Sequence, residues 1–93
     1  MRVQVSCINK RQHHNPHERI MNLGGFHNSS RWLLSENAVI QDIESGNNNY
    51  YVSVGNRTVD VIIAEHEGRK YLKTTADGYS PDNLLSLNEC SLQ

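Results

Sequence analysis

The sequence lacks several features that mark large protein classes. Its apolar runs are far shorter than the ~18 residues of a membrane-spanning helix, and no secretion-signal pattern is found, so we expect no membrane association. Aromatic residues make up only 6% of the chain, which favours a core of Val, Ile and Leu. An HExxH zinc motif is also missing. These absences favour a small cytoplasmic protein.

Cysteine is scarce as well, with Cys7 near one end of the sequence and Cys90 near the other. In a cytoplasmic protein we expect both thiols to be reduced, each acting as a small buried apolar side chain. The alternative is a disulfide that joins the two ends, which requires the two Cα atoms to lie within bonding reach.

Charge is balanced in total but not along the chain. A length of 93 residues fits one domain, 1–93, with a net charge of −1. Residues 1–31 carry a net charge of +4 and four of the five His residues, whereas residues 32–93 carry −5. The asymmetry predicts one basic surface and one acidic surface.

The clearest structural signal is a β-meander over residues 50–74. Three segments alternate between apolar and polar residues and are separated by turn-forming residues, which predicts strands at Tyr50–Val54, Thr58–Ala64 and Lys70–Thr74. The middle strand is apolar on both faces and should be central. The same alternation predicts an N-terminal strand at Val3–Ile8.

The clearest helix is predicted over residues 35–45. Ser35 has the position of an N-cap, Val39, Ile40 and Ile43 form an apolar stripe, and Gly46 suits a left-handed C-terminal cap. The whole pattern predicts an α+β domain: an antiparallel sheet of about four strands with this helix packed on one face. A crossover through the helix would make the first strand parallel to a neighbour.

The segment 9–31 is polar and loses the strand alternation. Asn15-Pro16-His17-Glu18 has the spacing of a helix start, which predicts a helical turn over 16–22 that Gly24 and Gly25 end. Residues 26–30 are typical of a loop or short hairpin. Ser80-Pro81 repeats the signature and predicts a second helical turn, tied to the core by Leu84.

Candidate binding residues are basic side chains and histidines. Cations of this kind bind phosphates, and Trp32, Tyr50 or Tyr51 would stack on bases if exposed. His13 and His17 lack a helical face that would make them metal ligands, so we expect no metal or cofactor, and no nucleophile has the spacing of a catalytic motif. The candidates are Lys10, Arg11, His13, His14, His17, Arg19, Arg31, Arg69, Lys70 and Lys73.

Taken in order, these motifs resemble the small bacterial domain-of-unknown-function family numbered 3892 (DUF3892). The resemblance extends over nearly the whole chain and implies no activity and no catalytic residues. It is carried by Asn15-Pro16-His17-Glu18-Arg19-Ile20, Gly24-Gly25, Trp32, Ala38, Ile40, Ile43, Tyr50-Tyr51-Val52, Gly68-Arg69-Lys70-Tyr71-Leu72-Lys73-Thr74, Asp77-Gly78, Asn83-Leu84-Leu85-Ser86-Leu87 and Cys90.

We therefore expect a non-enzymatic binding or regulatory module that acts on a protein partner through the loop 10–31 and the strand 69–73. One alternative is a nucleic-acid-binding module that uses the same basic, His-rich loop. Another is an inhibitor of a host system encoded by a phage or mobile element. An edge strand at Lys70–Thr74 would allow a homodimer, although its lysines would equally discourage strand pairing.

Overall fold

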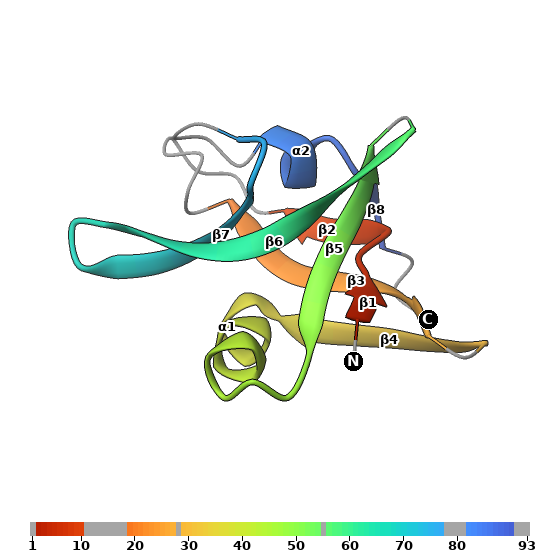
Figure 1. The fold of residues 1–93 in the computed structure, drawn as a ribbon, viewed down its shortest axis with the longest axis horizontal. Coiled ribbons are helices and arrows are strands. Elements are labelled where there is room, and N and C mark those ends of the chain that lie inside the picture. The colour runs from red at the N-terminus through yellow and green to blue at the C-terminus, as the bar shows by residue number, and fades with distance from the viewer. Residues whose placement is uncertain (1, 11–18, 28, 55, 78–81, 91–93) are drawn as a thin grey trace.

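A computed structural model describes residues 2–10, 19–27, 29–54, 56–77 and 82–90, and shows a small α+β domain built from two four-stranded sheets (Figure 1). One sheet has the strand order β1-β5-β6-β7, and the other has the order β4-β3-β2-β8. The strands are β1 (Arg2–Gln4), β2 (Cys7–Lys10), β3 (Ile20–His27), β4 (Ser30–Ser35), β5 (Asn49–Val54), β6 (Arg57–His66), β7 (Arg69–Thr74) and β8 (Asn88–Glu89); the helices are α1 (Glu36–Glu44) and α2 (Asp82–Leu85).

The predicted single antiparallel sheet is wrong, because the N-terminal segment is two strands that belong to different sheets. Val5 donates its N–H to the carbonyl of Tyr51 at 2.8 Å, and Ser6 donates to the carbonyl of Gly24 at 2.9 Å. Two consecutive amides thus bind opposite sheets, and the chain crosses between the sheets at this point. Both sheets are mixed, since β1 is parallel to β5 and β2 is parallel to β8.

Strands β3 and β4 pair as an antiparallel hairpin where a helical turn was predicted. The predicted helical turn over 16–22 is wrong from Ile20 onward, and residues 16–18 lie outside the described part of the chain. Gly24 and Gly25 do not end a helix. They leave room for close neighbours, because a Cβ on Gly24 would lie 2.9 Å from Cys90 Sγ, and one on Gly25 would lie 2.5 Å from the carbonyl oxygen of Gln4.

The meander and the helix caps are confirmed. Strands β5, β6 and β7 are antiparallel neighbours with β6 in the middle. Glu67 and Gly68 both have positive φ (51° and 81°), as a tight two-residue hairpin turn requires. Ser35 Oγ accepts the N–H of Ala38 at 3.2 Å, and Gly46 follows the helix with φ of 79°.

The core lies between the two sheets, which cross each other in Figure 1. Helix α1 contacts strands of both sheets, so it closes one end of the core and does not cover a single sheet face; α2 lies at the opposite end. The largest completely buried side chains come from both sheets and both helices. They are Val5, Ile8, Ile20, Leu23, Val39, Val52, Leu72, Thr74 and Leu84.

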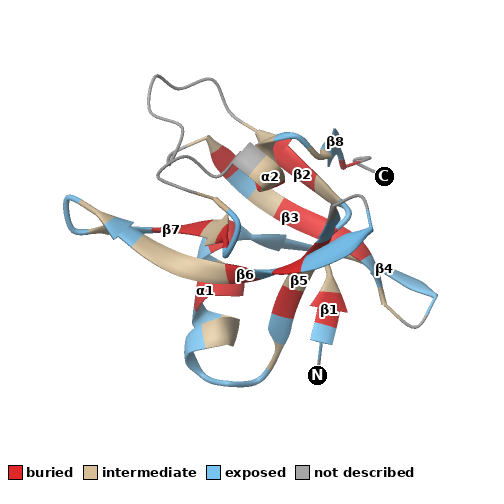
Figure 2. Ribbon diagram, turned by 45° about the horizontal axis from the view of Figure 1, so that its top comes forward, coloured by how far each residue is buried: buried red, intermediate tan, exposed pale blue. Residues whose placement is uncertain are grey.

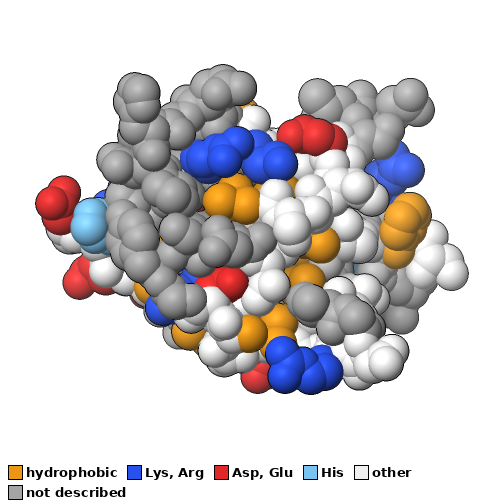
Figure 3. All heavy atoms as spheres, turned by 90° about the horizontal axis from the view of Figure 1, so that it is seen from above, with side chains coloured by type: hydrophobic (Ala, Val, Ile, Leu, Met, Phe, Trp, Pro, Cys, Tyr) orange, Lys and Arg blue, Asp and Glu red, His pale blue; other side chains and the backbone are white. Residues whose placement is uncertain are grey.

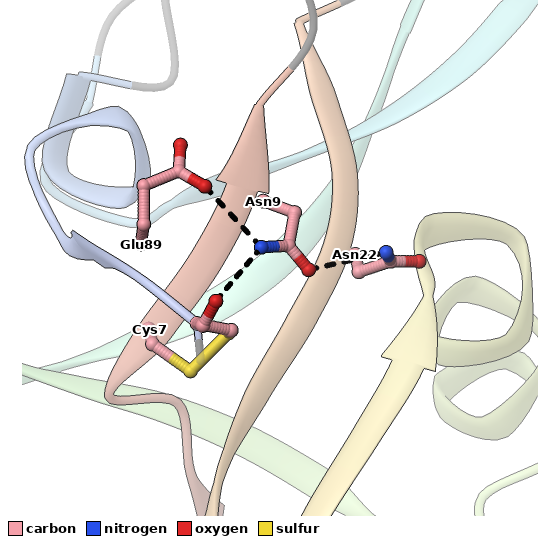
Figure 4. The surroundings of a disulfide bond; sticks show 5 residues. Cys7, Asn9, Asn22 and Glu89 are labelled. Carbon is pink, nitrogen blue, oxygen red and sulfur yellow. Dashed lines mark hydrogen bonds between the residues drawn. A yellow bond between two sulfur atoms is a disulfide. The ribbon is translucent and has the colours of Figure 1, made fainter. Parts of the chain in front are cut away.

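A disulfide joins Cys7 to Cys90, so the expectation of two reduced thiols is wrong and the alternative holds. Such bonds are rare in cytoplasmic proteins. The disulfide and the buried side chain of Asn9 together hold β8 beside β2 (Figure 4). The Asn9 side-chain amide donates to Glu89 and to the carbonyl of Cys90, both at 3.3 Å, and its oxygen accepts a hydrogen bond from Asn22 at 3.2 Å.

Candidate functional site

Strand β4 is an edge strand, and among the described residues no partner is found for the outward backbone groups of Leu33. Gly24 uses its carbonyl to accept the N–H of Ser6, so its polar backbone groups face away from β4. Leu33 is its register partner, and by the antiparallel pattern the N–H and C=O of Leu33 therefore point away from β3. No hydrogen bond to these groups is found within the described chain. Figure 2 shows most of β4 as exposed.

Strand β7, one of the two edge strands of the other sheet, differs from β4. Carboxylates from outside the sheet accept hydrogen bonds from its backbone amides. Leu72 N–H donates to Glu36 Oε2 at 3.3 Å, and Thr74 N–H donates to Asp77 Oδ2 at 2.9 Å. Glu36 is only 4% exposed and also holds Arg69 at 3.3 Å. A new strand would have to displace both carboxylates, so β7 is closed to strand pairing.

A groove of about 540 Å³ lies along β4, between this edge and the β1–β5 side of the other sheet. Its walls are mainly apolar, and they include Leu34, which is 36% exposed, and part of Leu33. The lining residues are Val3, His27, Ser30, Trp32, Leu33, Leu34, Asp42, Asn48 and Tyr50. The outward N–H and C=O of Leu33 thus border a groove that has space for side chains.

One carboxylate is held in the wall of this groove. Asp42 Oδ2 accepts hydrogen bonds from the Tyr50 hydroxyl at 2.6 Å and from Asn48 Nδ2 at 2.8 Å. These bonds, that from Tyr50 first, lower the pKa of Asp42. Burial, and then the bond to Asp42, raises the pKa of Tyr50. The carboxylate is therefore charged and fixed in position at neutral pH.

The described basic candidates lie on several elements: Lys10 on β2, Arg31 on β4, and Arg69, Lys70 and Lys73 together on β7. Lys10 Nζ donates to the Leu85 carbonyl at 3.1 Å, Lys70 pairs with Glu44, and Arg69 pairs with Glu36. On the face seen in Figure 3, Lys and Arg side chains form separate groups, not one continuous surface. Arg19 precedes β3, Lys73 is half-buried on β7, and Arg11, His13, His14 and His17 lie outside the described residues.

The remaining basic candidate, Arg31, lies on β4 itself. Its guanidinium is 5.5 Å from the ring centre of Phe26, which is 61% exposed, so both flank the open edge on the side opposite Trp32. Trp32 is half-buried and packs on Tyr50, which is only 3% exposed, with 5.6 Å between ring centres. Neither ring is presented as a base-stacking surface, whereas Tyr51 is covered by the Arg2 guanidinium at 4.3 Å.

The sequence predicted a loop or short hairpin over residues 26–30, and the hairpin alternative is correct, but no strand was predicted over residues 30–35, so the β4 edge was missed. One local signal was present: Trp32-Leu33-Leu34 is an apolar run directly before a helix cap. Asp42 and Tyr50 were placed on elements but not connected, since they meet only when α1 packs beside β5. Within the described residues, no helix is long and apolar enough to cross a membrane.

Comparison with known proteins agrees with the motifs. No curated protein and no solved structure matches the chain. A family model described as "Protein of unknown function (DUF3892)" matches residues 4–88, which includes every described strand from β2 to β7 and both helices. The chain therefore belongs to the DUF3892 family.

Proposed function

We propose that the protein is a non-enzymatic binding module that captures an extended segment of a partner protein by strand addition at β4. The observation that carries this proposal is the outward backbone of Leu33, which lies open beside a groove. In strand addition, main-chain hydrogen bonds supply affinity, and alternate side chains of the added strand enter neighbouring pockets. The β4 edge offers both features, since the outward backbone of Leu33 lies beside the groove.

The two long edge strands differ in a way that favours β4. Proteins commonly protect sheet edges with charges or covering groups, and β7 has both: the carboxylates of Glu36 and Asp77 and the ion pair of Lys70. On β4, Leu33 and Leu34 are exposed, with Phe26 beside them on β3. An edge that is both open and apolar is typical of an interaction surface.

This proposal keeps the expected type of partner but moves the surface from the loop 10–31 and the strand 69–73 to β4. A nucleic-acid-binding module remains the alternative for residues 10–31, and it predicts binding that weakens steeply with salt. Inhibition of a host system would be one use of strand capture. The charges on Arg69 and Lys70 have a role inside the fold, where they attach β7 to α1.

The test uses a displayed library of random linear octapeptides, selected on the wild-type protein. Leu33→Pro removes the outward N–H without removing a bond to β3, and proline is tolerated on edge strands. Leu33→Ala is the matched control, because it shortens the side chain but keeps the N–H. We expect selected peptides to bind wild type and Leu33→Ala and to lose binding to Leu33→Pro.

Amide hydrogen exchange supplies a second readout. The Leu33 amide should exchange rapidly in the free protein and slowly when a selected peptide is bound. Circular dichroism and thermal unfolding establish whether Leu33→Pro is folded. Peptides that bind Leu33→Pro as well as wild type, or a library that yields no binder, would contradict strand capture at β4.

A further inference from the structure

We infer that the captured segment carries a lysine or arginine on the side that faces the groove, and that Asp42 binds this cation. This inference rests on the proposed strand capture and names its specificity. Asp42 lies in the groove wall, and its carboxylate is held by hydrogen bonds from Tyr50 and Asn48. Both short hydrogen bonds end on Oδ2, and no ion pair among the described residues involves Asp42.

The other residues of the groove explain why the charge of Asp42 decides which side chain can bind there. Among the described residues that line it, only Asp42 belongs to the group Asp, Glu, Lys and Arg, and most of the other walls are apolar. A strand that covers the groove removes water from the carboxylate, which is costly unless an opposite charge replaces the water. A cationic side chain on the bound strand meets this need, whereas an apolar or acidic one does not.

The same charge argues against a second copy of this chain as the occupant. Trp32 packs toward Tyr50, so Ser30, Trp32 and Leu34 share the groove side of β4, while Arg31 lies on the opposite side near Phe26. A second β4 strand would therefore bring serine, tryptophan and leucine to the groove and no cation. The second β4 strand would cover Asp42 without bringing it a cation, which favours a different chain with a basic residue.

The experiment uses the strongest peptide from the octapeptide selection, resynthesised with lysine, glutamine or glutamate at each position in turn. At one groove-facing position, we expect glutamine in place of lysine to weaken binding to wild type about tenfold, as for a hydrogen bond to a charged group. Asp42→Asn should remove this preference and leave the glutamine peptide bound.

Glu44→Gln is the matched control, since Glu44 lies two residues farther along α1 and pairs with Lys70 outside the groove. This variant should keep the full preference for lysine. Loss of the preference in Glu44→Gln as well as in Asp42→Asn would overturn the role of Asp42.

The remaining outcomes separate the two proposals. Selected peptides that bind through Leu33 but show no lysine preference would overturn the basic-residue inference and leave strand capture standing. Failure of every peptide, together with a dimer in sedimentation that Leu33→Pro dissociates, would overturn both and identify a second copy as the occupant.

Discussion

Replacing both Cys7 and Cys90 with serine should strongly destabilise the domain, because the disulfide joins residues 83 positions apart. In the chain-entropy model, closing a loop of this length lowers the entropy of the unfolded chain enough to stabilise the fold by about 4.5 kcal/mol at 25 °C. Small domains have total unfolding free energies of about 5–15 kcal/mol. The double variant should therefore lose about 30% or more of its stability.

Urea denaturation tests this magnitude on three samples: oxidised wild type, wild type with a thiol reductant, and the double serine variant. For slopes of about 1–3 kcal/mol/M, the loss corresponds to a midpoint lower by about 1.5–4.5 M. The reduced wild type and the variant should agree. A midpoint shift below about 0.5 M would refute the entropic reasoning, and two titratable thiols in denatured, unreduced protein would refute the pairing itself.

A local effect accompanies the global one. Strand β8 has two residues, and Cys90 N–H donates to the Ile8 carbonyl at 3.0 Å, so the disulfide supplies much of what holds this strand. In the reduced protein the Cys90 amide should exchange faster than amides of the β5–β6 ladder. Equal protection in both redox states would show that the Asn9 hydrogen bonds hold β8 without the disulfide.

Three further predictions follow from the contacts. Glu36→Ala should cost about 1–3 kcal/mol in chemical denaturation, because it leaves a buried β7 amide unsatisfied, and it should cost more than Glu44→Ala, whose ion pair is exposed to water. Tyr50→Phe should flatten the pH dependence of the unfolding free energy. Asp42 has a lowered pKa, so its ionised form stabilises the fold above the unfolded-state pKa of 3.8, and this stabilisation is lost as the pH falls. Tyr50 has a raised pKa, so its neutral form stabilises the fold below the unfolded-state pKa of 10.0, and this stabilisation is lost as the pH rises. An unchanged profile would contradict the hydrogen bond between them. Gly25→Ala should lower the thermal midpoint, at a cost of about 1–3 kcal/mol, because its Cβ would meet a backbone carbonyl; wild-type stability would contradict the close approach.

Features that depend on neighbours in the sequence were predictable. The Ser35 cap bonds an amide three residues away, and the Glu67-Gly68 turn connects adjacent strands. The meander follows from the same local rules, since each of its strands pairs with the next one in the chain. Family membership was also evident from motif order, as the match over residues 4–88 shows.

Residues 20–27 show where local reading fails. Gly24-Gly25 is a helix-breaking pair by propensity, yet both residues lie inside β3. Glycine is needed at these two positions because the disulfide and Gln4 approach them too closely for any side chain. The crossing at Val5–Ser6 is equally hidden, since an alternating pattern continues through a point where the backbone changes sheets.

The sequence by itself determined the meander, the capped helix and the family. The tertiary structure alone decided that there are two sheets, that Cys7 and Cys90 are joined by a disulfide, and that carboxylates bind the β7 amides whereas no described residue binds the outward backbone of Leu33 on β4. The physical reason is separation along the chain: Glu36 caps an amide 36 residues away and Cys7 bonds a residue 83 away. Local propensity carries no information about contacts at such distances, and these contacts decide which sheet edge is covered.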